Sequence, residues 1–192
     1  MKRLSTAVIA AATGLVLLVP TQAQAGSYAR PDAANDVSSS TGDGPFVRTP
    51  SRIEGDIRSS AVAHAPRRVL VAIGFGQLTQ TTELTGHLFR LRTNKGKVRW
   101  VTVVAGPGHW AGRTVMQKPN GRRVKCRFGT SIDYAADRVR VSIPRRCLSG
   151  PRWVRVGIGA VSIQDEVYYA DDALTDGIIR ANPIYGPLVR RG

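Results

Sequence analysis

The sequence has few of the residues from which metal centres and redox sites are usually built. Its 192 residues include 2 cysteines and 3 histidines, too few for a zinc ribbon or an array of zinc fingers. Aromatic residues make up 6% of the chain, and no apolar run is long enough to span a bilayer as a helix. Acidic residues are also scarce, 13 against 28 Lys and Arg. What remains is enough chain for one domain of ordinary size, with a formal charge of +15.

The first 25 residues show the three-part pattern of a secretory signal peptide. Lys2 and Arg3 form a positive start, residues 7–19 are apolar or small apart from Thr13, and Ala23-Gln24-Ala25 is a cleavage signal. No second apolar segment follows. We therefore expect removal of residues 1–25 and release of the product as an extracellular protein. A buried N-terminal helix is the alternative interpretation.

Export also bears on the two cysteines. Thiols are oxidised outside the cell, so we expect one disulfide between Cys126 and Cys147. The chain-entropy model gives such a loop about 3 kcal/mol of stabilisation. Two free thiols are the alternative.

Patterning after the signal peptide predicts an all-β fold. Residues 26–53 are rich in small, polar and turn residues, which is typical of a flexible arm. From residue 54 the apolar residues recur with period two, as in Val69, Val71 and Ile73. Similar runs predict strands near residues 89–92, 98–104, 122–128, 138–143 and 153–158. We expect a single antiparallel β-sandwich of about 7–9 strands over residues 54–170, then an irregular C-terminal tail at 171–192.

No combination of residues predicts catalysis. The sequence has no Gly-x-Ser-x-Gly motif, and the adjacent pair Asp165-Glu166 would point to opposite faces of a strand. We therefore assign no catalytic residue and no cofactor, and an uncharacterised hydrolase is the last of three functional hypotheses. Asp171, Asp172 and Asp176 precede a glycine as in a calcium loop, but Leu174 breaks the EF-hand spacing. No metal site is assigned, and calcium binding by this segment stays open.

Two groups of residues are candidates for ligand binding. His109 and Trp110 lie in a Gly-Pro-Gly turn, and Trp153 has outward parity, so their rings could contact sugars. Trp100, in the central strand, is expected in the core. A second group of basic residues is expected to face outward and to attract polyanions if their strands are neighbours. These are Arg90, Arg92, Arg99, Arg123, Lys125, Arg127, Arg138, Arg140 and Arg155.

These candidates define the functional hypotheses. The first is a monomeric, non-enzymatic extracellular module that binds glycan or cell-wall polysaccharide. The second is a salt-sensitive binder of polyanions through an outward arginine face. The alternative to a functional arginine face is that the excess of Arg over Lys reflects a GC-rich genome.

One block of sequence resembles a known group of proteins. The segment Ile143-Pro144-Arg145-Arg146-Cys147-Leu148, followed by Trp153-Val154-Arg155-Val156, is similar to an uncharacterised family of small exported actinobacterial proteins. The resemblance covers roughly residues 52–192. It implies an exported β-sandwich with one disulfide, and it implies no activity. A fainter analogy, resting on strand number and fold class, links the chain to DOMON-like and family-9 carbohydrate-binding sandwiches.

Overall fold

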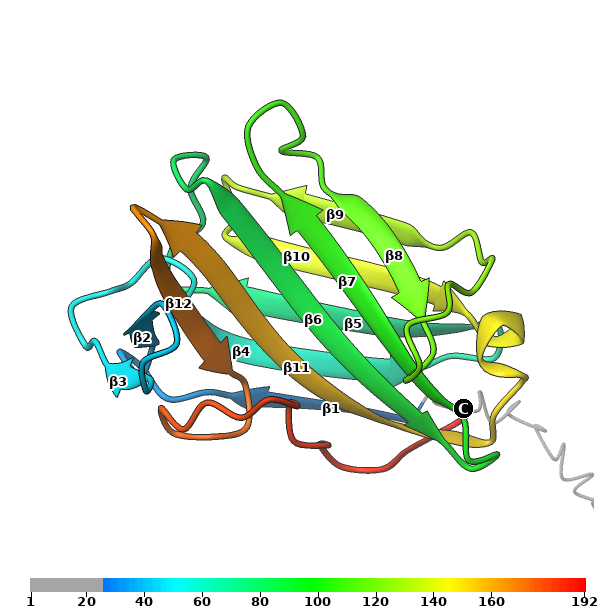
Figure 1. Cartoon of the computed structure of the whole chain (residues 1–192). Coiled ribbons are helices and arrows are strands. Elements are labelled where there is room, and N and C mark those ends of the chain that lie inside the picture. The colour runs from blue at the N-terminus through cyan, green and yellow to red at the C-terminus, as the bar shows by residue number, and fades with distance from the viewer. Residues whose placement is uncertain (1–25) are drawn as a thin grey trace, which may run out of the picture.

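The computed structural model describes residues 26–192, so the predicted signal peptide at residues 1–25 lies outside the described residues. The described chain forms two antiparallel sheets packed face to face, and it contains no α-helix (Figure 1). The predicted all-β sandwich is confirmed. In residues 26–192 there is also no helix long and apolar enough to cross a membrane.

The smaller sheet has five strands in the order β1-β4-β5-β10-β9. The bounds of these strands are Gly26–Pro31 for β1, Ile57–His64 for β4, Arg68–Phe75 for β5, Arg138–Pro144 for β10 and Gly129–Asp133 for β9. Every neighbouring pair in this sheet is antiparallel.

The larger sheet has the order β3-β2-β12-β11-β6-β7-β8, and β13 pairs with the start of β11. Its strands are β2 (Ser38–Thr41), β3 (Val47–Arg48), β6 (Leu84–Thr93), β7 (Val98–Ala105), β8 (Arg113–Gln117), β11 (Trp153–Gln164), β12 (Val167–Asp172) and β13 (Val189–Arg190). A short 3-10 helix, η1 (Arg145–Leu148), follows β10.

The core lies between the sheets and follows the predicted alternation. Val69, Val71 and Ile73 of β5 are almost fully buried, as are Phe89 and Leu91 of β6 in the opposite sheet. Each strand turns its apolar residues inward because successive side chains of a strand point to opposite faces. The inner faces thus bury one continuous apolar cluster.

The expected flexible arm at residues 26–53 is wrong for this structure, because the segment supplies β1, β2 and β3. β1 pairs along its whole length with β4, from Gly26 opposite His64 to Pro31 opposite Ser59. Apart from Tyr28, which packs against the core, its side chains are small or polar and give little periodic signal. The tail at residues 171–192 also differs from the prediction, because it begins inside β12 and contains β13.

The strand predicted at residues 122–128 is also wrong, although its parity is right. Val124, Cys126 and Phe128 are partly buried against the core, yet the segment makes only an isolated bridge from Gln117 to Arg123. The apolar residues of this segment alternate because every second side chain packs over the open edge of the sandwich. β8 and β9 on either side of it belong to different sheets.

The predicted disulfide is confirmed. Cys126 and Cys147 are bonded, with 5.8 Å between their Cα atoms, and both pack against the core. The bond ties the segment before β9 to η1, so it closes the edge at which the chain passes from one sheet to the other.

Candidate functional site

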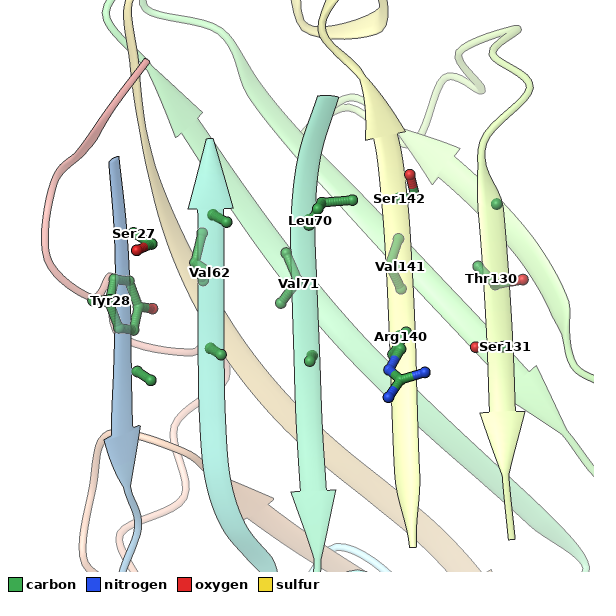
Figure 2. Close-up of a pocket in the computed structure, with 15 residues that line it drawn as sticks. Ser27, Tyr28, Val62, Leu70, Val71, Thr130, Ser131, Arg140, Val141 and Ser142 are labelled. Atoms are coloured by element: carbon green, nitrogen blue, oxygen red, sulfur yellow. The ribbon is translucent and has the colours of Figure 1, made fainter. Parts of the chain in front are cut away.

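A hollow of about 650 Å³ crosses the outer face of the five-stranded sheet (Figure 2). All five strands contribute to its lining, which runs from Ser27 on β1 to Ser131 on β9. We call this hollow the groove. Four steps between neighbouring strands make it about 19 Å long across the sheet.

The strand register explains why this face is hollow. Two rows of outward-facing residues run across the sheet, and almost all of them are alanine, serine or glycine. The first row is Ser27, Ala63, Leu70, Ser142 and Gly129, and the second is Ala29, Ala61, Ala72, Arg140 and Ser131. Outward positions on a strand usually carry long polar side chains. Small residues at these positions leave a floor on which an extended chain can lie.

The groove carries one positive charge. Arg140 is the one charged residue among the described residues that line it. Arg68 lies one row beyond the first row, at the start of β5. Its guanidinium donates a hydrogen bond to the Ser142 hydroxyl at 2.8 Å. Arg68 also lines a second hollow of about 560 Å³. This hollow shares Gly129 with the groove, and none of its described lining residues carries a carboxylate. We call it the basic hollow; it is lined by Arg67, Arg68, Arg127, Phe128, Gly129, Pro144 and Arg146.

The structure distributes the predicted basic residues over three regions. Arg138 and Arg140 lie on the outer face of the five-stranded sheet. The segment before β9 carries Arg123, Lys125 and Arg127, and the outer face of the eight-stranded sheet carries Arg90, Arg92 and Arg155. They therefore do not form one continuous face.

Two expectations about β7 are wrong. Arg99 was expected to face outward, but it shares the inner parity of Val101 and is 9% exposed at the end of the sheet. Trp100 was expected in the core, but it lies half-buried on the outer face, where the Arg90 guanidinium is 5.5 Å from its ring. With apolar residues at both parities of β7, the sequence pattern did not settle which set faces the core.

The predicted aromatic candidates do not form one site. His109 and Trp110 lie in the loop between β7 and β8, beside the Thr85 end of β6. Trp153 begins β11 at the opposite end of the same sheet, beside Thr93. Thr85 and Thr93 are eight residues apart along β6, which corresponds to about 27 Å.

The Trp110 side chain also packs against another residue of the protein. The ring of Tyr134 meets it edge-on with 6.1 Å between centroids, and the Tyr134 hydroxyl donates to the Trp110 carbonyl at 3.0 Å. His109 lies against the guanidinium of Arg113. These contacts fix the loop to the end of β9 and favour a structural role for Trp110.

A cluster of acidic side chains is buried near the start of β4, at the end of the five-stranded sheet opposite the basic hollow. Asp36, Asp56 and Asp171 each bring one carboxylate oxygen to within 4.8 Å of the others, and within residues 26–192 they form a group that could hold a metal ion. Burial, reinforced by the neighbouring carboxylates, raises the pKa of Asp171 to about 8. Burial also raises the pKa of Asp36, of Asp56 and, to about 7, of nearby Asp32.

Sequence reasoning missed this cluster. Asp36 comes from the segment assigned as a flexible arm, Asp56 precedes β4, and Asp171 lies one residue before the end of β12. No local spacing joins three residues so far apart in the chain. Of the segment suspected of binding calcium, Asp171 belongs to the cluster, whereas Asp176 is exposed and pairs with Arg48 at 3.0 Å.

Two of the three histidines are core residues. His87 is 1% exposed and its ring packs at a tilt against that of Phe75, with 5.4 Å between ring centroids. Burial lowers its pKa to about 4. His64 is fully buried, and burial lowers its pKa as well. Neither histidine lines the groove.

The sequence matches no protein-family model, and no curated protein matches it either. Membership of the exported actinobacterial family therefore stays a prediction.

Proposed function

We propose that the protein is an exported, non-enzymatic binding module that holds an extended acidic polysaccharide in the groove. The observation that carries the proposal is the floor of small side chains across five strands, with Arg140 on it and the basic hollow at its end. This keeps the predicted class of ligand, glycan or cell-wall material. It replaces the predicted tryptophan site by the groove.

Shape and charge together support a linear polyanion as the ligand. A groove that crosses five strands without a side wall suits a chain longer than a single sugar. Guanidinium groups bind carboxylates through paired, charge-assisted hydrogen bonds. Arg140 and Arg68 stand two rows apart along the strands, so both can reach acidic groups of one chain.

The lining favours binding over catalysis. The described residues around the groove include no histidine, carboxylate or thiol that could transfer a proton or attack a substrate. Serine and threonine hydroxyls are present, but no base lies among them. The disulfide and the predicted signal peptide fit a protein that works outside the cell.

The test is equilibrium binding of the oxidised protein to polygalacturonate, with a neutral glucan of matched length as the second probe. We expect the polyuronate to bind more tightly and its affinity to fall as salt rises. Arg140→Ala should weaken binding by about tenfold, the effect of losing one hydrogen bond to a charged group.

Arg155→Ala is the matched control, because Arg155 is exposed on the outer face of the eight-stranded sheet. It removes the same charge and should leave the affinity nearly unchanged. Equal losses in the two variants would mean that net charge alone attracts the ligand. Equal binding of both glycans, or no binding of either, would contradict the proposal.

A further inference from the structure

We propose that Asp36, Asp56 and Asp171 form a calcium-binding site that joins the N-terminal segment to both sheets. Asp36 lies between β1 and β2, Asp56 immediately precedes β4 of the five-stranded sheet, and Asp171 lies in β12 of the eight-stranded sheet. An ion held by all three would therefore connect parts of the chain that are distant in sequence. The site is separate from the groove, which none of these residues lines.

The three carboxylates are held in place by main-chain donors. In Asp36 and Asp56 one oxygen accepts a hydrogen bond from a backbone N–H group. In Asp171 both oxygens do, since Asp171 Oδ1 also accepts from the Asp172 N–H at 2.7 Å. Such bonds fix the side chains without neutralising them. The other donors are Gly177 to Asp36 at 3.0 Å, Asn35 to Asp56 at 2.9 Å and Ile57 to Asp171 at 2.6 Å.

Two of the other oxygens lack any partner, and this is the observation that points to a ligand. Within residues 26–192, neither Asp36 Oδ1 nor Asp56 Oδ1 has a hydrogen-bond partner, and both side chains are 0% exposed. Native structures rarely leave buried polar atoms unsatisfied, because each costs free energy comparable to a lost hydrogen bond. Asp32 Oδ2, beside the cluster, is buried and unpartnered too.

The charge balance points to a divalent cation. Among the described residues, the cluster has one ion pair, from Arg58 to Asp56 at 2.8 Å. With all three carboxyls ionised, one guanidinium would leave two negative charges in a buried place. A divalent ion would neutralise both and would satisfy the unpartnered oxygens at the same time.

The donor chemistry selects calcium. All of the available ligand atoms are oxygens, which excludes a preference for softer metals that favour nitrogen or sulfur. Calcium accepts irregular sets of carboxylate, carbonyl and water oxygens, whereas magnesium demands a near-ideal octahedron. Extracellular calcium modules bind with a Kd of about 10⁻⁴–10⁻³ M, and we expect an affinity in this range.

Shared protons are the competing way to relieve the charge. The carboxyls of Asp36 and Asp56 are close enough to hydrogen-bond when one is protonated. The experiment must therefore separate an ion from protons, which it does by varying calcium at fixed pH.

The experiment measures the thermal stability of the oxidised protein at neutral pH and constant ionic strength, with added Ca²⁺, Mg²⁺ or EGTA. At ten times the Kd we expect Ca²⁺ to raise Tm by about 3–6 °C, because it binds only the folded state. Isothermal calorimetry should show one Ca²⁺ per chain and weaker binding of Mg²⁺. Asp36→Asn should abolish the Ca²⁺-dependent rise.

Asp176→Asn is the matched control, since it removes one carboxylate from an exposed side chain in the neighbouring loop. It should keep the full response to Ca²⁺. If Asp36→Asn fails to fold, calorimetry on the unaltered protein decides the question by itself. A Tm unchanged by Ca²⁺, or no saturable heat, would overturn the proposal in favour of shared protons. A Tm raised equally by Mg²⁺ would overturn the assignment of the site to calcium.

Discussion

The guanidinium of Arg90 lies 4.6 Å from the ring centroid of Tyr185, which joins the C-terminal segment to the outer face of the eight-stranded sheet. The same guanidinium lies 5.5 Å from the ring of Trp100. A residue predicted to attract polyanions is therefore engaged by two aromatic rings. It contributes to the attachment of the chain end rather than to an open cationic surface.

Arg90→Ala should lower the free energy of unfolding by about 1 kcal/mol, the value of a cation–π contact near the surface. Chemical denaturation checks this. Arg92→Ala, two residues along the same outer face and exposed, should change stability by less than about 0.5 kcal/mol. Equal effects of the two substitutions would show that the aromatic contacts contribute nothing.

Gly157→Ala should release the C-terminal segment. A Cβ at this position would lie 2.7 Å from the carbonyl oxygens of both Pro183 and Ile184, which are backbone atoms that cannot turn aside. We expect a loss of about 1–3 kcal/mol. Hydrogen exchange should also become faster at Gly186, whose N–H donates to the Val156 carbonyl.

Gly129→Ala is the control for that substitution, because a Cβ there meets nothing closer than Ser142 at 3.8 Å. It should leave both stability and exchange unchanged. Unaltered exchange at Gly186 in the Gly157 variant would mean that the segment can shift at no cost.

Ala72→Phe should block the groove while leaving its charges in place. Ala72 stands in the middle of the second row, between Ala61 and Arg140, and faces outward. A phenyl ring there should occupy the hollow and reduce polygalacturonate affinity by about tenfold or more, with little change in Tm. Unchanged affinity would locate the bound chain elsewhere on the protein.

Removing the disulfide should lower stability by about 3 kcal/mol, the chain-entropy value for a loop of about this length. The bond closes a separation of 21 residues, and its two half-cystines pack on the core. The double variant Cys126→Ser, Cys147→Ser tests this by denaturation without added reductant. Because the loop includes β9, the variant should also lose exchange protection in β9 before β4.

The sequence was sufficient for the parts of the fold that bury apolar residues with period two. β5, β6, β10 and β11 were predicted because one parity is apolar and the other is not. β1 was missed, since its serine and alanine residues carry no such contrast. The inner parity of β7 stayed ambiguous for the opposite reason, with valines on both faces.

Neither candidate site could be predicted from local sequence. The groove exists because small residues at outward positions, such as Ala61 and Ala72, fall opposite each other, and that depends on strand register. The sequence alone shows that β4 and β5 have alanines at positions where long polar side chains are usual. It does not show that these alanines form one row across five strands. The acidic cluster depends on topology, because Asp36 and Asp171 meet only after β12 pairs with β2.

His87 makes the stability of the protein depend on pH. The ring is buried against Phe75, its Nδ1 has no hydrogen-bond partner within the described chain, and burial lowers its pKa to about 4. In the unfolded chain the pKa is about 6.5. A lowered pKa means that the folded state resists protonation, so stability is complete above pH 6.5. It falls as the pH drops toward 4, by about 3 kcal/mol in total.

His87→Leu should remove this part of the pH dependence. The measurement is the free energy of unfolding of both proteins between pH 7 and pH 4, read as the difference between variant and unaltered chain. The acidic cluster titrates in both proteins, so its contribution cancels in that difference. The variant should gain relative stability continuously as the pH falls below 6.5. The control is His109→Leu, at an exposed histidine, whose free energy of unfolding should change with pH as that of the unaltered protein does. The same result for His87→Leu would mean that protonation of the His87 ring costs the fold nothing.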